Sequence, residues 1–539
     1  ALIGIIVWVV RQKQNDSADY FLGGRDATWL AIGASIFASN IGSEHLIGLA
    51  GAGASSGMAM AHWEIQGWMI LILGWVFVPF YTRSMVYTMP EFLERRYNPQ
   101  SRTILSVISL VSYVLTKVAV TVYAGGLVFQ QVFGIKELWG IDFFWIAAIG
   151  LVVLTALYTI FGGMKSVLYT SVLQTPILLL GSLIILVLGF KELGGWDEMM
   201  RVCGAVTVND YGDTMTNLIR SNDDANFPWL GALIGSAIIG FWYWCTDQFI
   251  VQRVLSGKNE MEARRGTIFG AYLKLLPVFL FLIPGMIAFA LHQKYIGAGG
   301  EGFLPMLANG TANADAAFPT LVAKLLPAGV KGLVVCGILA ALMSSLASLF
   351  NSSAMLFTID FYKRFKPETP EKKLVGIGQI ATIVIVVLGI LWIPIMRSVG
   401  DVLYTYLQDV QSVLAPGIAA AFLLGICWKR TSAQGGMWGL ISGMVIGLTR
   451  LGAKVYYSNA GEVADSTFKY LFYDMNWLFF CGWMFLFCII VVIVVSLATE
   501  APTAEKIQGL VFGTATKEQK AATRASWNHW DIIHTVIIL

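Results

Sequence analysis

Long apolar runs recur along almost the whole chain. Runs long enough to cross a membrane are centred near residues 40, 70, 115, 150, 180, 240, 280, 340, 385, 415, 440 and 485. A helix needs roughly 20 mostly apolar residues to span a hydrocarbon core of about 30 Å. Because helices satisfy their own backbone hydrogen bonds in lipid, the sequence predicts an all-α polytopic membrane protein.

Both ends of the chain are also apolar. The runs ALIGIIVWVV and DIIHTVIIL are each too short to cross a bilayer alone, and we interpret them as truncated or partly ordered helices. With these two ends the pattern predicts about 14 transmembrane helices. The 539 residues are 57% hydrophobic and 13% charged, with a net charge of +3. This balance favours a lipid bilayer and excludes a nucleic acid as the partner.

Lysine and arginine are concentrated in one set of alternate loops. These loops include residues 83–102, 253–265, 363–373 and 506–524. Basic residues accumulate on the cytoplasmic side of membrane proteins, so we predict that this set is cytoplasmic and that the opposite set is external. The expected location is the plasma membrane, or the inner membrane of a bacterial cell.

A few ionisable residues stand inside the apolar runs. They are Glu44, His45, Glu64, Lys117, Asp247 and Lys274. A charge in hydrocarbon is costly, so such residues usually face a cavity and serve a function. The alternative is an internal pair that only fixes packing, for example a carboxylate with Lys117 or Lys274, and the sequence leaves both interpretations open.

The composition of two apolar runs predicts that each forms an interrupted helix. Residues 33–57, GASIFASNIGSEHLIGLAGAGASSG, carry Ser, Asn and closely spaced Gly, and residues 238–248, IIGFWYWCTDQ, carry aromatic and polar residues. Broken helices at corresponding positions of two repeats mark the binding site of secondary transporters. Their freed carbonyl groups can hold a cation.

A third run offers hydroxyl groups to such a cation. Ala341, Ser344 and Ser345 stand at i, i+3 and i+4, and therefore share one helix face. Two hydroxyls and several carbonyls make an uncharged oxygen site with no group that a proton could titrate. This favours Na⁺ over H⁺, although small residues also permit close helix packing.

Sugar recognition requires amide, carboxylate and imidazole groups around the hydroxyls and an aromatic face against the ring. The candidate polar residues are Asn40, His45, Glu64, Lys274 and Gln408. Tyr243 and Trp244 are the candidate platforms. The alternative for the aromatic residues is a belt at the membrane interface, but they stand beside Thr246 and Asp247 in an interrupted run.

Several stretches resemble one transporter family. They are ASNIGSEHLIGLAGAGASSG, VYTMPEFLERRY, FGGMKSVLYTSVLQT, FWYWCTDQFIVQRVLSGK, AALMSSLASLFNSSA and APGIAAAFLLGICWKR. Together they resemble the sodium/glucose cotransporter branch of the solute:sodium symporter family, over nearly the whole chain.

The resemblance implies a leucine-transporter-like core of two inverted five-helix repeats. We expect an extra N-terminal helix and cytoplasmic loop over 1–26, the first repeat over 27–190, an external loop over 191–227, the second repeat over 228–427 and C-terminal helices over 428–539.

The resemblance also implies the roles of individual residues. The carbonyls of Ala38, Ile41 and Ala341 and the hydroxyls of Ser344 and Ser345 would form the sodium site. The substrate would be bound by Asn40, His45, Glu64, Lys274 and Gln408, with Tyr243 stacking on the ring as the inner gate and Trp244 beside it. The outer gate would consist of Leu49, Trp63 and Tyr404.

Two details of the comparison with this family affect the prediction. Ser171 stands where many members carry an aspartate for a second sodium, so we predict one Na⁺ per substrate molecule. The sequence SEH at residues 43–45 is similar to the myo-inositol members of the branch. A cyclic polyol is therefore a possible substrate.

These observations predict a sodium-coupled symporter that imports a hexose of the glucose or galactose type by alternating access. Na⁺ is the expected coupling ion, no organic cofactor is implied, and an enzyme is not expected. The alternatives are a sodium/myo-inositol symporter and a sugar-gated sensor without uptake. The sequence leaves the oligomeric state open.

Overall fold

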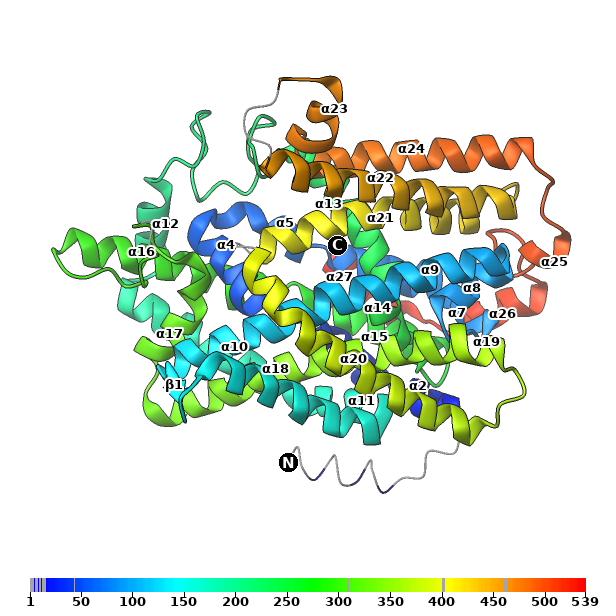
Figure 1. Ribbon diagram of the computed structural model, residues 1–539, viewed down its shortest axis with the longest axis horizontal. Coiled ribbons are helices and arrows are strands. Elements are labelled where there is room, and N and C mark those ends of the chain that lie inside the picture. The colour runs from blue at the N-terminus through cyan, green and yellow to red at the C-terminus, as the bar shows by residue number, and fades with distance from the viewer. Residues whose placement is uncertain are drawn as a thin grey trace.

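Helices run side by side along the long axis of the molecule (Figure 1). The computed structural model describes residues 16–42, 44–307, 310–399, 403–459 and 464–539, together with positions 4, 8 and 11. The predicted truncated helix at the N-terminus lies mostly outside the described residues. At the other end, α27, His529–Ile538, is a helix of 10 residues.

Eight helices among the described residues are long and apolar enough to cross a membrane. They are Gly57–Ser84, Phe143–Leu193, Trp229–Thr246, Glu260–Gly297, Ala328–Phe365, Glu371–Pro394, Val410–Cys427 and Trp477–Ala498. Two shorter apolar helices, Trp29–Asn40 and Ala119–Phe133, supplement them. The prediction of an all-α polytopic membrane protein is therefore confirmed.

The range predicted for the first repeat begins with a helix that is interrupted in its middle. Its elements are α3 Trp29–Asn40, η2 Glu44–Leu49, α4 Ala50–Ser55, η3 Gly57–Met60, α5 Ala61–Glu64, α6 Gly67–Ile72, η4 Leu73–Phe77, α7 Val78–Ser84, α8 Met89–Arg96, α9 Pro99–Ser112, η5 Tyr113–Val118, α10 Ala119–Phe133 and α11 Phe143–Leu193. A two-stranded hairpin, β1 Glu137–Leu138 with β2 Ile141–Asp142, lies between α10 and α11.

The range predicted for the second repeat also begins with an interrupted helix. Its elements are α13 Trp229–Gly240, η6 Phe241–Thr246, α14 Gln248–Leu255, α15 Glu260–Lys274, η7 Val278–Leu282, α16 Ile283–Gly297, η8 Ala314–Ala316, α17 Ala317–Leu325, α18 Ala328–Met355, η9 Leu356–Tyr362, α19 Lys363–Phe365, α20 Glu371–Val399 and α21 Leu403–Cys427.

The remaining elements flank these two ranges. They are α2 Ser17–Leu22, η1 Gly23–Arg25, α12 Trp196–Gly204, α22 Ala433–Asn459, α23 Thr467–Lys469, η10 Tyr470–Asp474, α24 Trp477–Ala498, α25 Ala504–Ile507, α26 Lys517–Ala525 and α27. In Figure 1, α22 and α24 lie together at the top of the bundle. The repeat boundaries remain a prediction.

Helix α11 contains two of the predicted spans. A straight helix of 51 residues would be about 77 Å long, which is more than twice the hydrocarbon core. Gly163 breaks it with φ 52° and ψ −148°. A Cβ at Gly163 would lie 2.4 Å from the carbonyl oxygen of Tyr20, so only glycine fits this turn.

Both predicted helix breaks are confirmed. Helix α3 ends at Asn40, and Ile41 follows in an extended conformation before the π-helix η2 begins at Glu44. In the second case the π-helix η6 ends at Thr246, and Asp247 is extended and caps α14. Each interruption leaves backbone groups without helical partners in the middle of a membrane-spanning segment.

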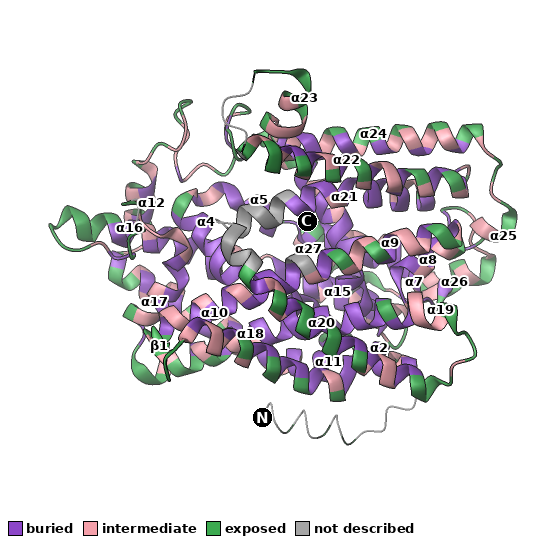
Figure 2. Ribbon diagram, in the orientation of Figure 1, coloured by how far each residue is buried: buried purple, intermediate pink, exposed green. Residues whose placement is uncertain are grey.

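Polarity is arranged as a bilayer requires. Buried residues run through the middle of the bundle, and exposed ones lie on its outside (Figure 2). Many exposed side chains on the outer helices are large and apolar, including Leu391, Trp483 and Val494, which suits contact with lipid. The predicted external elements α12, β1 and α17 lie at one end of Figure 1, and α8, α19, α25 and α26 lie at the other.

Helices α4 and α16 pack with their backbones almost in contact. A Cβ at Gly53 would lie 2.3 Å from the carbonyl oxygen of Leu282, and one at Gly285 would lie 2.0 Å from that of Ala50. Small residues allow such close approach in membranes, where dispersion replaces the hydrophobic effect as the attraction between helices. This contact fixes the outer half of the first interrupted helix.

We expect Gly53→Ala and Gly285→Ala each to lower the melting temperature of the purified protein by several degrees. The added methyl group must push the two helices apart, at a cost of roughly 1–3 kcal/mol. Gly376→Ala in α20 is the control, because a Cβ there meets nothing within 4 Å. Thermal unfolding in detergent, followed by tryptophan fluorescence, measures the difference. Equal melting temperatures for all three variants would contradict this account.

Candidate functional site

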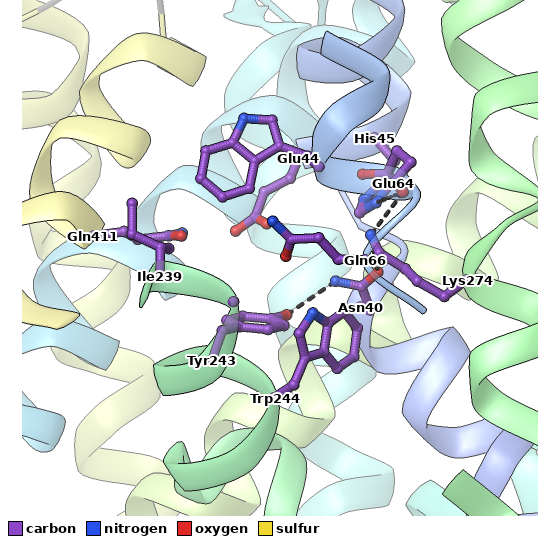
Figure 3. A pocket seen from close by; sticks show the side chains of 12 residues that line it. Asn40, Glu44, His45, Glu64, Gln66, Ile239, Tyr243, Trp244, Lys274 and Gln411 are labelled. Carbon is purple, nitrogen blue, oxygen red and sulfur yellow. Dashed lines mark hydrogen bonds and ion pairs between the residues drawn. The ribbon is translucent and has the colours of Figure 1, made fainter. Parts of the chain in front are cut away.

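A cavity lies between the two interrupted helices. The space in it that a water molecule can enter measures about 50 Å³, so in this conformation the cavity is narrower than ligand pockets of about 300–1,000 Å³. Its lining residues are Asn40, Glu44, His45, Trp63, Glu64, Gln66, Ile239, Gly240, Tyr243, Trp244, Lys274 and Gln411 (Figure 3). The structure thus brings together all the predicted substrate-binding residues except Gln408, whose side chain lies outside the described part of the chain.

A buried ion pair forms one wall of the cavity. Lys274 Nζ lies 2.7 Å from Glu64 Oε2 and donates to Asn40 Oδ1 at 3.3 Å. The pair joins α5 to α15, and both side chains are almost fully buried. A buried charge must be paired, and removing one member of such a pair costs about 3–5 kcal/mol. Both side chains line the cavity together with Asn40 (Figure 3).

His45 adds an imidazole to the same wall. Its Nε2 lies 3.3 Å from Glu64 Oε2, whereas its Nδ1 is buried without a hydrogen-bond partner among the described residues. Its ring packs against Phe281 with centroids 6.1 Å apart. An unpartnered buried nitrogen is costly, and a ligand hydroxyl would satisfy it.

Tyr243 and Trp244 form an aromatic wall at the second helix break. Their rings meet edge to face with centroids 4.9 Å apart. The Tyr243 hydroxyl accepts a hydrogen bond of 3.1 Å from Asn40 Nδ2, and the Lys274 ammonium lies 5.4 Å from the Trp244 ring centroid. Asn40 therefore connects the aromatic wall to the charged one (Figure 3).

The cavity also contains polar residues that were not among the predicted ligands. Glu44 was identified only as an intramembrane charge, and Gln66 and Gln411 were missed. Gln66 Nε2 donates to the Ser236 carbonyl at 3.0 Å, and its Oε1 would lie 2.4 Å from a Cβ at residue 240. Gly240 therefore leaves space that the Gln66 amide occupies. The glutamine at residue 66, two positions after Glu64 and before a glycine, was the available sequence signal.

The predicted sodium site lies next to this cavity, where α18 meets the end of α3. Ser345 Oγ, as donor, lies 2.9 Å from the Ser39 carbonyl oxygen and 3.4 Å from that of Ile41. The pairing of Ile41 with Ser345 was predicted, whereas the contribution of Ser39 was not. Ala38 and Ala341 are buried on the same two helices. These groups are neutral oxygens, which suit a hard monovalent cation.

Further hydroxyl groups lie beside the predicted sodium site. Ser344 Oγ lies 3.2 Å from Ser171 Oγ, and Ser39 Oγ lies 2.7 Å from Ser348 Oγ. Ser171 also donates to the Val167 carbonyl at 2.6 Å. The position expected for a second-sodium carboxylate is therefore occupied by a neutral hydroxyl that already has a partner.

The predicted outer gate is resolved in part. Leu49 is buried in η2, and Trp63 lines the cavity. The Trp63 ring stacks on that of Trp477 at the start of α24, with centroids 5.8 Å apart and planes 15° apart. A helix outside the predicted repeats therefore supports this residue. Tyr404 lies in α21, but its side chain is outside the described part.

The chain matches the sodium:solute symporter family model over residues 20–443. It is 36% identical to human sodium/myo-inositol cotransporter 2 over 527 residues, which is 95% of this chain and 77% of that protein. It is 37% identical to the human sodium/myo-inositol cotransporter over 536 residues, 95% of this chain and 74% of that protein.

The fold is similar to that of a solved Na⁺-coupled sialic acid symporter in a substrate-bound outward-open state. The TM-score is 0.72 at 21% identity, over 93% of this chain and 98% of that one. At this identity the likeness concerns the fold alone. The predicted leucine-transporter-like architecture is confirmed.

We expect Ser345→Ala to weaken the sodium dependence of the protein. Loss of one neutral oxygen ligand weakens the binding free energy of Na⁺ by about 1.4 kcal/mol. This raises the half-saturating sodium concentration about tenfold. Ser353→Ala is the control, because Ser353 is buried in the same helix and its hydroxyl has no partner in the described structure. Sodium-dependent tryptophan fluorescence or uptake measures the difference. A normal sodium response of the Ser345→Ala variant would refute this sodium site.

Proposed function

The chain belongs to the sodium:solute symporter family, and we propose that it imports a cyclic polyol of the myo-inositol type together with Na⁺. The observation that carries this proposal is the convergence of Asn40, His45, Glu64 and Lys274 on one cavity with an aromatic wall. We further propose that it works in the plasma membrane, or in the inner membrane if its source is bacterial.

The chemistry of the cavity supports a ligand with many hydroxyl groups. Carboxylate and amide oxygens accept hydrogen bonds, whereas the Lys274 ammonium and the amide nitrogens donate them. A hydroxyl group does both, so it can pair with any of these groups. Tyr243 and Trp244 offer apolar faces to the C–H side of a ring.

Two considerations favour a polyol over a hexose. The relatives of about 36% identity are named as myo-inositol cotransporters. In addition, Glu44 and Glu64 both line the cavity, and each ring carbon of a cyclitol carries a hydroxyl that can donate to a carboxylate. The ring oxygen of a pyranose cannot donate. A glucose or galactose type of hexose, the main prediction from the sequence, becomes the second candidate.

We propose that Na⁺ drives uptake by alternating access. Bound Na⁺ would tie the end of α3 to α18 through Ser345 and so stabilise the outward-facing state with an ordered cavity. Substrate binding would close the outer gate at Leu49, Trp63 and Tyr404, and Na⁺ would then leave to the cytoplasm. One charge moving through 100 mV supplies about 2.3 kcal/mol before the concentration gradient is counted.

Two other classes of function can be separated from transport. A sugar-gated sensor would use the same cavity but produce currents without solute uptake, so a flux measurement distinguishes it. We propose no enzymatic activity, because the cavity residues are explained by binding and the sequence contains no catalytic motif.

We expect purified protein in liposomes to accumulate labelled myo-inositol when Na⁺ is supplied on the outside only. Uptake of glucose and galactose is expected to be weaker, and K⁺ in place of Na⁺ should abolish uptake, because the neutral oxygen site selects by size. Accumulation of a hexose alone would favour the second candidate. If neither polyol nor hexose were accumulated, the proposed function would be wrong.

The coupling ratio is expected to be one Na⁺ per substrate molecule, because Ser171 provides no carboxylate for a second ion. In liposomes of defined sodium gradient and membrane potential, the substrate gradient at which net flux stops gives this ratio. At the same sodium gradient and membrane potential, coupling to two ions would square the ratio of inside to outside substrate concentration at which net flux stops. The measured ratio therefore distinguishes one coupled ion from two. A reversal point that requires two ions would contradict the role given to Ser171.

A further inference from the structure

A second buried ion pair lies beyond the cavity, at the second helix break. Lys117 Nζ lies 2.6 Å from Asp247 Oδ2, and both side chains are almost fully buried. The other oxygen of Asp247 accepts a hydrogen bond from the Tyr113 hydroxyl. That hydroxyl in turn accepts from the backbone N–H of Phe249 at 3.0 Å. The pair therefore joins η5 of the first predicted repeat to the break between η6 and α14 of the second.

Four aromatic rings surround the Lys117 ammonium. Its Nζ lies 4.8 Å from the ring centroids of Tyr243 and Phe249, 5.1 Å from that of Tyr113 and 5.3 Å from that of Trp242. Ring faces attract a cation, and more strongly where water is excluded. Tyr243 is shared, because it lines the substrate cavity and also contacts the ammonium.

The position along the chain places this pair on the exit side of the cavity. From η6, the chain passes Asp247, continues through α14 and reaches the basic segment 253–265, which is predicted to be cytoplasmic. A solute leaving the cavity for the cytoplasm must pass Tyr243 and then the contact between η5 and η6. Both segments are π-helices, which are frequently found at functional sites.

From this arrangement we propose that Lys117 positions Tyr243 and that its ion pair with Asp247 seals the cytoplasmic exit until the two segments separate. The proposal rests on the proposed transport function. Lys117 is not among the residues that line the cavity, so it acts through Tyr243 and Asp247.

The physical chemistry of a buried ion pair suits a seal that must open. Desolvation of two charges offsets most of their attraction, so the paired, dry state and the separated, hydrated state differ little in free energy. An apolar contact of the same area would always favour closure. Arg253 also has Nε and Nη2 buried without a partner among the described residues, and water entering the exit would satisfy them.

The neutral double variant Lys117→Met/Asp247→Asn tests the proposal. Each single variant leaves one charge buried without its partner and is expected to unfold more easily. The double variant removes both charges at nearly constant volume, so it should keep the melting temperature within a few degrees of the wild type. Lys117→Arg retains the charge and the stacking on aromatic rings, and is expected to rescue function.

Two measurements separate a seal from a merely structural pair. Without substrate, the half-time of ²²Na⁺ leak from liposomes should rise about tenfold in the double variant, because an uncharged contact at this place favours the closed exit. The KM for substrate exchange should also rise about tenfold, because Tyr243 loses its support. Arg265→Met/Asp531→Asn is the matched control, since it removes another cytoplasmic-side ion pair, 2.9 Å long, and both values should stay at wild-type level.

The leak assay needs no substrate, so it distinguishes this proposal from the transport proposal. A wild type that accumulates no polyol or hexose would overturn the proposed function, while the ²²Na⁺ leak would still report on the seal. A folded double variant with normal leak and normal KM would overturn the inference. So would a double variant that does not fold, because the pair would then be required for stability alone.

Discussion

Two buried ion pairs, one at each helix break, cross between the two predicted repeats. Glu64 pairs with Lys274, and Lys117 pairs with Asp247. The hydroxyl of Ser345 binds the carbonyls at the end of α3 in the same way. An isolated charge at the centre of a bilayer costs about 2.5–3.5 kcal/mol on insertion scales, so each partner depends on the opposite repeat. Movement of one repeat against the other therefore cannot leave these contacts unchanged. A ligand that binds at one of them would shift the relative position of the two repeats.

The sequence revealed which residues matter in the bilayer, but not how they pair. Glu64, Lys117, Asp247 and Lys274 stand out because each interrupts an apolar run, and a pair with Lys117 or Lys274 was one expectation. The actual partners are 130 and 210 residues apart in the chain. Periodicity describes one helix at a time, so it contains no information on which distant helices meet. The family resemblance supplied that information for the sodium site, where Ile41 and Ser345 meet as expected.

Gln66, one of the residues missed in the cavity, faces it because the backbone there is irregular. Glu64 and Gln66 would point to different sides of a regular helix, yet a turn at Ile65 and Gln66 separates α5 from α6 and both residues line the cavity. The π-helices η2 and η6 likewise change which of their residues point to the cavity, compared with a regular α-helix. Composition predicted that these segments are broken, but the extra residue per turn arises from packing against neighbouring helices. Ser39 was also missed, because its contribution is a carbonyl and not a side chain.

Three consecutive residues connect the proposed sodium site to the cavity. Ser39 and Ile41 present their carbonyls to Ser345, and Asn40 between them bridges Lys274 and Tyr243 in the cavity. A cation held by the carbonyls would fix the backbone at 39–41, and so would set the position of the Asn40 amide. The linkage is reciprocal. If the cation raises the affinity for the substrate by some factor, a substrate that orders Asn40 raises the affinity for the cation by the same factor. Because Asn40 also holds the hydroxyl of Tyr243, whose ring contacts Lys117, order imposed by Na⁺ at the proposed site would extend to the residues that we propose close the opposite side of the cavity.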